Sequence, residues 1–178
     1  MDKKDFRNRC LEKIRKRAKR SSLVVDKTIC NILYKDIKKR NSKVIMLYIP
    51  MIIEVNIKPL ILKLRREKQT ILVPFMEGES FRLVKYRLPL KRKKFGIKET
   101  KYSNQYRKKD IDISIVPILG IDSTDRRVGF GKGMYDRFFD NTKHNIKRVI
   151  FISRLNCVSS EIITNNYDIK ANLIIYGK

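Results

Sequence analysis

The chain is poor in residues that build metal clusters and histidine-dependent sites. It has no tryptophan, one histidine and three cysteines, at positions 10, 30 and 157. A single histidine and widely separated cysteines predict neither a Cys/His metal site nor a histidine-based triad. Because their number is odd and their spacing follows no motif, we expect the three cysteines to be buried or reduced thiols.

Long apolar runs are also missing. No stretch approaches the length that crosses a bilayer, and the N-terminus is charged rather than signal-like. We therefore expect a cytoplasmic protein without membrane contact. The 178 residues, 42% of them hydrophobic, are enough for a real core, and we expect one domain over 1–178.

Acidic residues are few against the basic ones. The chain has 43 Lys and Arg but 18 Asp and Glu, which gives a formal net charge of +25. Such a charge attracts polyanions, so a basic nucleic-acid-binding protein is one hypothesis. The basic residues are scattered, however, and no RNA-binding signature with interleaved aromatics is present. An enzyme whose ligands carry phosphates and carboxylates fits the charge equally well, and we do not expect nucleic acid to be the partner.

Glycine is scarce, yet three of the seven glycines alternate at positions 129, 131 and 133. Without Cβ atoms, they allow backbone N–H groups to turn toward a bulky anion. A helical pattern follows directly, and a loop of bare amides at a helix N-terminus binds phosphate. The segment 127–139 therefore predicts a phosphate cradle, with a plain glycine-rich turn as the alternative.

Charged residues around these glycines extend the prediction. Arg127 and Lys132 add cationic donors, and Asp136 adds a hard oxygen that could hold Mg²⁺ or pair with a neighbouring arginine. The loop is not a Walker A sequence, because Arg126 and Gly133 stand where that motif needs glycine and Ser or Thr. It also departs from the dinucleotide fingerprint, whose third glycine comes one residue later.

Strands alternate with helices along the chain, which predicts an α/β fold: a three-layer α-β-α domain with a mainly parallel sheet. We expect helices at 2–19, from Ser22 through Ile37, at 56–67 and after the glycine loop. We expect strands at 44–49, 70–74, 81–86, 111–116, 147–153 and 172–176. The polar segment 87–109 predicts a mobile loop over a site. Parallel sheets bind ligands at the carboxyl ends of their strands, here after Ile49, Val116 and Ser153.

The order of these pieces resembles the 5-formyltetrahydrofolate cyclo-ligase family, also called 5,10-methenyltetrahydrofolate synthetase, over nearly the whole chain. The most specific match is a Val-Pro strand end, an Asp and an Arg-x-Gly-x-Gly-x-Gly-x-Tyr-Asp segment: Val116, Pro117, Asp122, Arg127, Gly129, Gly131, Gly133, Tyr135 and Asp136. Weaker matches follow the same order: Lys3 with Phe6 and Arg7, Tyr48 through Val55, Phe95-Gly96-Ile97 with Glu99, and Tyr167 through Tyr176.

The resemblance implies a reaction. ATP, the co-substrate, phosphorylates the formyl oxygen of 5-formyltetrahydrofolate. N10 then attacks the activated carbon, and 5,10-methenyltetrahydrofolate forms with release of ADP and phosphate. Phosphoryl transfer requires positioning and charge neutralisation more than covalent help from the protein. We expect Mg²⁺ as cofactor, a substrate with or without a polyglutamate tail, and a monomer.

Site residues are implied in the same way, with Arg127, Lys132 and Tyr135 as the catalytic ones. ATP binding is implied for Lys3, Arg7, Arg127, Val128, Gly129, Phe130, Gly131, Lys132, Gly133, Met134 and Tyr135. Substrate binding is implied for Ile49, Glu54, Phe130, Gly131, Lys132, Gly133 and Met134. Metal binding is implied for Asp136 and Asn172.

Two positions depart from the family pattern. Asn172 replaces an Asp, so an uncharged amide oxygen would face the metal unless Asp168 substitutes for it. Arg154 stands where an uncharged polar residue is more usual. The first departure motivates a third hypothesis, a folate or nucleotide binder without ligase activity. Simpler roles stay open for other residues: Glu54 could cap the helix that follows it, and Lys3 and Arg7 could be a solvated helix face.

Overall fold

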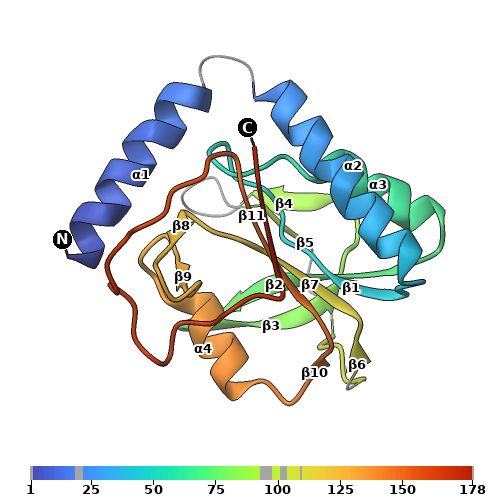
Figure 1. The fold of residues 1–178 in the computed structure, drawn as a ribbon. Helices are drawn as coiled ribbons and strands as arrows, with labels where there is room; N and C mark the ends of the chain where they lie inside the picture. Colours follow the sequence, from blue (N-terminus) through green and yellow to red (C-terminus); the bar gives the residue numbers. More distant parts are fainter. Residues whose placement is uncertain (1, 19–21, 93–97, 101–103, 109, 178) are drawn as a thin grey trace.

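A six-stranded sheet forms the centre of the computed structural model, which describes residues 2–18, 22–92, 98–100, 104–108 and 110–177 (Figure 1). Its strand order is β12-β11-β7-β1-β2-β3. The strands are β1 (Val44–Met46), β2 (Thr70–Glu77), β3 (Ser80–Lys85), β7 (Ile113–Pro117), β11 (Val149–Ser153) and β12 (Leu173–Tyr176). Neighbouring strands are parallel except β3, which pairs antiparallel with β2 at one edge. The prediction of a mainly parallel sheet is confirmed.

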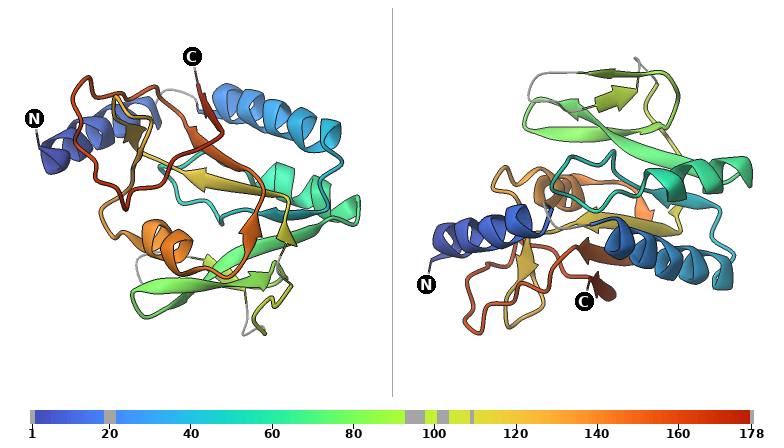
Figure 2. Two further views of the ribbon diagram at one scale, coloured as in Figure 1. Left: turned by 60° about the horizontal axis from the view of Figure 1, so that its bottom comes forward. Right: turned by 90° about the horizontal axis from the view of Figure 1, so that it is seen from above.

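Helices cover both faces of the sheet. Helices α2 (Leu23–Lys39) and α3 (Lys58–Arg66) pack on one face, and α4 (Met134–Asn141) packs on the other (Figure 2). Because strand side chains alternate between faces, Ile45 and Leu47 join the core under α2 and α3, while Met46 joins the core under α4. No helix in the described part of the chain is long and apolar enough to cross a membrane.

Helix α1 (Lys3–Ala18) lies apart from these layers (Figure 1). Its apolar stripe of Phe6, Cys10 and Ile14 is buried against Leu119 and Val128, beyond the carboxyl end of β7. The helix is therefore placed beside the segment that leads into the glycine loop.

The segment 87–109 contains more regular structure than we predicted. Strand β4 (Leu90–Arg92) pairs antiparallel with β5 (Lys98–Thr100), and Gln105 forms a bridge with Val84 of β3. The prediction of an irregular loop is wrong for these parts, because strands of three residues are too short to show a period of two. The motif Phe95-Gly96-Ile97 lies outside the described residues.

Four further two-residue strands pair outside the central sheet. They are β6 (Asp110–Ile111) with β10 (Asn145–Ile146), and β8 (Gly120–Ile121) with β9 (Arg127–Val128). The β8–β9 pair carries the chain from the end of β7 into the glycine loop.

The cysteines correct a second prediction. Cys10 of α1 and Cys157 form a disulfide across 147 residues, with their Cα atoms 6.1 Å apart, and Cys30 is the free, buried thiol. Burial raises the pKa of the Cys30 thiol to about 11. We predicted buried or reduced thiols. All three cysteines are buried, but Cys10 and Cys157 are oxidised, and a pair so distant in sequence gives no spacing signal.

Candidate active site

The glycine-rich loop lies between β9 and the amino end of α4. Gly131 has a φ angle of 105° and Gly133, the residue that precedes α4, has a φ angle of 59°. L side chains rarely adopt these conformations, so the turn into the helix requires glycine at both positions. Gly131 and Lys132 are exposed, which leaves this loop open to a ligand at the positive end of a helix.

Arg127 is buried beneath this loop. Its Nε and Nη2 donate to the carbonyl oxygen of Pro117 at 3.3 and 3.2 Å, and Nη1 donates to Asp136 Oδ2 at 3.1 Å. The guanidinium carbon lies 5.0 Å from the centre of the Tyr135 ring. A Cβ atom on Gly129 would fall 2.3 Å from Nη1, so glycine is needed there for Arg127 to fit. Arg127 thus joins the end of β7, the loop and α4.

The two carboxylate oxygens of Asp136 differ in their hydrogen bonding. Oδ2 accepts from Arg127, whereas the buried Oδ1 has no hydrogen-bond partner among the described residues. A buried carboxylate oxygen without a donor fits a cation such as Mg²⁺, which prefers hard oxygen ligands. In the described part of the chain, no three His, Cys, Asp or Glu side chains group as a metal site, so the rest of such a shell would come from ligand and water.

Asn172 does not lie near Asp136. It precedes β12, where its Oδ1 accepts the backbone N–H of Val149 at 2.7 Å. Val149 is level with Ser114 on β7, whereas Arg127 and Asp136 meet at Pro117. Three residues of strand separate the two places by about 10 Å. Of the two predicted metal ligands, Asp136 lies at the glycine loop and Asn172 does not.

The first turns of α1 bring two cations to this region. Arg7 Nε donates to the carbonyl oxygen of Gly129 at 3.1 Å, and Lys3 forms an ion pair with the buried Asp168. These contacts argue against a purely solvated helix face. Asp168 is engaged by Lys3 and by the backbone N–H of Asn165.

Glu54 is a buried carboxyl in the turn after β1. Its Oε2 accepts the backbone N–H of Met51 at 2.9 Å, and burial raises the pKa of Glu54 to about 7, against the opposing pull of Arg127 and Arg154. The pKa of the Tyr135 hydroxyl is also raised, chiefly by burial and then by the charge of Glu54. Glu54, Tyr135 and Arg127 therefore act on one another electrostatically.

The remaining predicted residues differ in exposure and in the core that they contact. Lys132 is exposed, and Val128 is fully buried. Phe130 packs on the α1 core, Met134 on the core under α4, and Ile49 on the core under α2 and α3. Lys132 is thus accessible at the loop, whereas Phe130 anchors the loop to α1 and Met134 packs into the core under α4.

The ion pair between Arg154 and Asp26 was not predicted from the sequence. Arg154, at the end of β11, binds both carboxylate oxygens of Asp26 at 2.8 Å and donates to the carbonyl oxygen of Ile52 at 2.7 Å. This buried pair fixes the turn that carries Glu54. Arg154 departs from the family pattern, but Asp26 lies within a helix and gave no signal of its own.

Comparisons with known proteins agree with this architecture. A solution structure of Aquifex aeolicus 5,10-methenyltetrahydrofolate synthetase matches with a TM-score of 0.79 and 24% identity, over 99% of this chain and 90% of that one. The Mycoplasma pneumoniae 5,10-methenyltetrahydrofolate synthetase matches with a TM-score of 0.74 and 22% identity, over 98% of each chain. At these identities the likeness establishes the fold.

Sequence similarity reaches the same group of proteins. The chain is 29% identical over 112 residues to a 5-formyltetrahydrofolate cyclo-ligase of Haemophilus influenzae, a match that spans 59% of this chain and 60% of that protein. The model of the 5-formyltetrahydrofolate cyclo-ligase family matches residues 1–177. The chain therefore belongs to the 5-formyltetrahydrofolate cyclo-ligase family.

Proposed function

We propose that this protein converts 5-formyltetrahydrofolate to 5,10-methenyltetrahydrofolate with consumption of ATP, acting as a monomer through a single domain over 1–178. The observation that carries the proposal is the ion pair of the buried Arg127 with Asp136, which holds the glycine loop at the carboxyl edge of the sheet in a chain matched throughout by the family model. This arrangement suits phosphoryl transfer, which depends on positioned positive charge.

On the ATP side, the loop residues Gly129 to Gly133 bind the phosphates through backbone N–H groups. Lys132 is exposed above them, and Arg7 and Lys3 add charge from α1. The protein thereby neutralises the γ-phosphoryl group as it moves to the formyl oxygen. Asp136 Oδ1 would hold Mg²⁺, which would add positive charge against the phosphates.

On the folate side, the turn after β1 contributes Ile49 and Glu54. A buried carboxyl with a pKa of about 7 accepts or donates a hydrogen bond at the pterin according to its protonation. Tyr135 is within electrostatic reach of both Glu54 and Arg127, and we assign it the positioning of the formyl group. N10 then attacks the activated carbon, and phosphate leaves.

The assay is direct. Purified protein with 5-formyltetrahydrofolate and MgATP should produce the ultraviolet absorbance of the methenyl product together with equimolar ADP.

Lys132→Ala should lower kcat/KM by about 10- to 100-fold, since it removes one charge from the phosphate site. Lys143→Ala is the matched control, because Lys143 is also exposed but follows α4 at its other end. Absence of product, or an unchanged Lys132→Ala variant, would contradict the proposal.

A binder without ligase activity is the second candidate, and it depended on a weakened metal site at Asn172. That residue accepts from Val149, at the level of Ser114 on β7, whereas Asp136 pairs with Arg127 at Pro117. We therefore expect Asn172→Asp to leave turnover within about twofold of the parent, since it changes no group at the loop. A large increase in turnover would favour the second candidate.

A further inference from the structure

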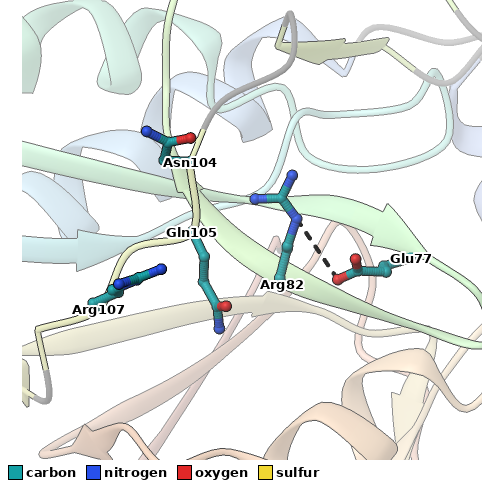
Figure 3. Close-up of a pocket in the computed structure, with 5 residues that line it drawn as sticks. All are labelled: Glu77, Arg82, Asn104, Gln105 and Arg107. Atoms are coloured by element: carbon teal, nitrogen blue, oxygen red, sulfur yellow. Dashed lines mark ion pairs between the residues drawn. The ribbon is translucent and has the colours of Figure 1, made fainter.

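A polar cavity of about 730 Å³ lies beside the edge strand β3. It is lined by Glu77, Arg82, Asn104, Gln105 and Arg107 (Figure 3). Its volume falls in the range of small-molecule sites. None of these residues takes part in the phosphate site described above, so the cavity needs a separate account.

The side chain of Arg137 connects the turn beside this cavity to the glycine loop. Glu77 ends β2, and two residues later the carbonyl oxygen of Glu79 accepts from Arg137 Nε at 2.9 Å. Arg137 also donates to the carbonyl oxygen of Lys132. The turn between β2 and β3 therefore separates the cavity from the loop, and both lie at the carboxyl edge of the sheet.

The lining is suited to carboxylates. Arg82 Nε lies 3.6 Å from Glu77 Oε2, and its guanidinium lies over the Phe75 ring at 4.7 Å, so its position is fixed. Arg107 enters from the segment that bridges β3, and the side-chain amides of Asn104 and Gln105 add donors (Figure 3). Two guanidinium groups against one carboxylate give a net positive lining, and arginine binds carboxylates through paired N–H groups.

We infer that this cavity binds the glutamate tail of the folate substrate, an inference that rests on the proposed function. Folate carries its pterin at one end and its glutamate carboxylates at the other, across the p-aminobenzoyl ring. Strands β2 and β3 follow β1 in the sheet, so a tail that runs along the strand ends in that direction, from a pterin between Glu54 and the glycine loop, reaches the cavity. Each further γ-linked glutamate adds one carboxylate to a cavity with several donors.

The test compares tails and variants. Arg107→Glu reverses one charge, and Arg82→Met removes the other while keeping contact with Phe75. Each should raise KM for the monoglutamate by at least about fivefold and for the triglutamate by more, with kcat and KM for ATP unchanged. Arg66→Ala, an exposed arginine at the end of α3 near the start of β2, is the control and should change neither constant.

A ligand without the glutamate tail separates the contribution of the tail from that of the pterin. 5-Formyltetrahydropteroate lacks glutamate, so its KM should be the same in the parent protein and in Arg107→Glu. If KM for the triglutamate is unaffected by both substitutions, or if KM for the pteroate rises as much as KM for the triglutamate, the tail is bound elsewhere. A rise in KM for ATP instead would assign the cavity to phosphate.

Calorimetry separates this inference from the proposed function. If the parent protein forms no product, titration with the triglutamate in the absence of ATP still reports on the cavity. Binding that Arg107→Glu weakens would retain the carboxylate site while the ligase activity is rejected. Equal binding by the parent and the variant would overturn the inference.

Discussion

At the scale of single residues, the two carboxylate oxygens of Asp136 have different surroundings. Asp136 was expected to hold a metal or to pair with an arginine, and its two oxygens divide these roles. One oxygen pairs with Arg127, and the other has no donor among the described residues. Residue types and spacing identified the loop and its charges, but not which atoms meet, because that depends on the contacts of the folded chain.

Asp136→Asn tests this division. The amide keeps the size of the side chain but removes the charge that faces Arg127 and a cation. We expect kcat to fall by about 100-fold and the Mg²⁺ concentration for half-maximal rate to rise. Steady-state turnover measured against Mg²⁺ checks this. Asp140→Asn, an exposed residue of the same helix, should behave as the parent. Unchanged Mg²⁺ dependence in Asp136→Asn would exclude Oδ1 as a ligand.

Glu54 gives a prediction about stability and pH. Burial raises the pKa of this carboxyl from 4.5 to about 7 in the folded protein. The folded state therefore binds the proton more tightly than the unfolded state, and this stabilisation is full below pH 4.5 and is lost as the pH rises through 7. Glu54→Gln lacks this dependence. Relative to the parent, its free energy of unfolding should increase by about 3 kcal/mol from acid to mildly alkaline pH.

Urea unfolding of both proteins without ligand, at about pH 5 and about pH 8, measures this difference. Taking the difference between parent and variant cancels the titration of all groups that they share. A difference that is the same at both pH values would show that Glu54 titrates normally in the folded protein.

At the scale of elements, periodicity predicted the helices and the long buried strands. A helix over 2–19 was predicted, and in α1 the stripe of Phe6, Cys10 and Ile14 is buried. What covers the stripe was not predictable, because Leu119 and Cys157 are more than a hundred residues away. Strands β4 and β5 were missed for a different reason: three residues each, with a basic stretch between and within them, show no alternation.

The disulfide makes the position of α1 testable. Cys10→Ser opens a loop closed by residues 147 apart, which should cost about 4–5 kcal/mol of the free energy of unfolding in the chain-entropy account. KM for ATP should also rise, since α1 carries Lys3 and Arg7. Urea unfolding with and without dithiothreitol measures the first effect. Cys30→Ser retains the disulfide and should still respond to dithiothreitol, whereas Cys10→Ser should not. If dithiothreitol does not change the urea midpoint of the parent protein, the disulfide does not have this role.

At the scale of the whole molecule, three segments far apart in the chain meet at one edge. The sequence predicted ligand contacts after Ile49, Val116 and Ser153, and the structure places β1, β7 and β11 side by side. The rule that parallel sheets bind at their carboxyl ends predicts only that these three strand ends share one edge of the sheet. The order of the strands and the position of α1 required pairing information that one sequence does not contain.

The net charge of +25 gives the last prediction. Arg127 and Arg154 are buried in ion pairs and cannot reach a nucleic-acid backbone, and basic residues are spread along the chain rather than gathered in one motif. We therefore expect binding to a short single-stranded RNA to be weaker than about 1 μM at about 200 mM salt, with a steep loss of affinity between about 50 and about 200 mM. Fluorescence anisotropy measures both. Turnover of the folate should be unaffected by RNA at the higher salt. Nanomolar binding that persists there would instead support the nucleic-acid hypothesis, because nonspecific attraction alone cannot produce it.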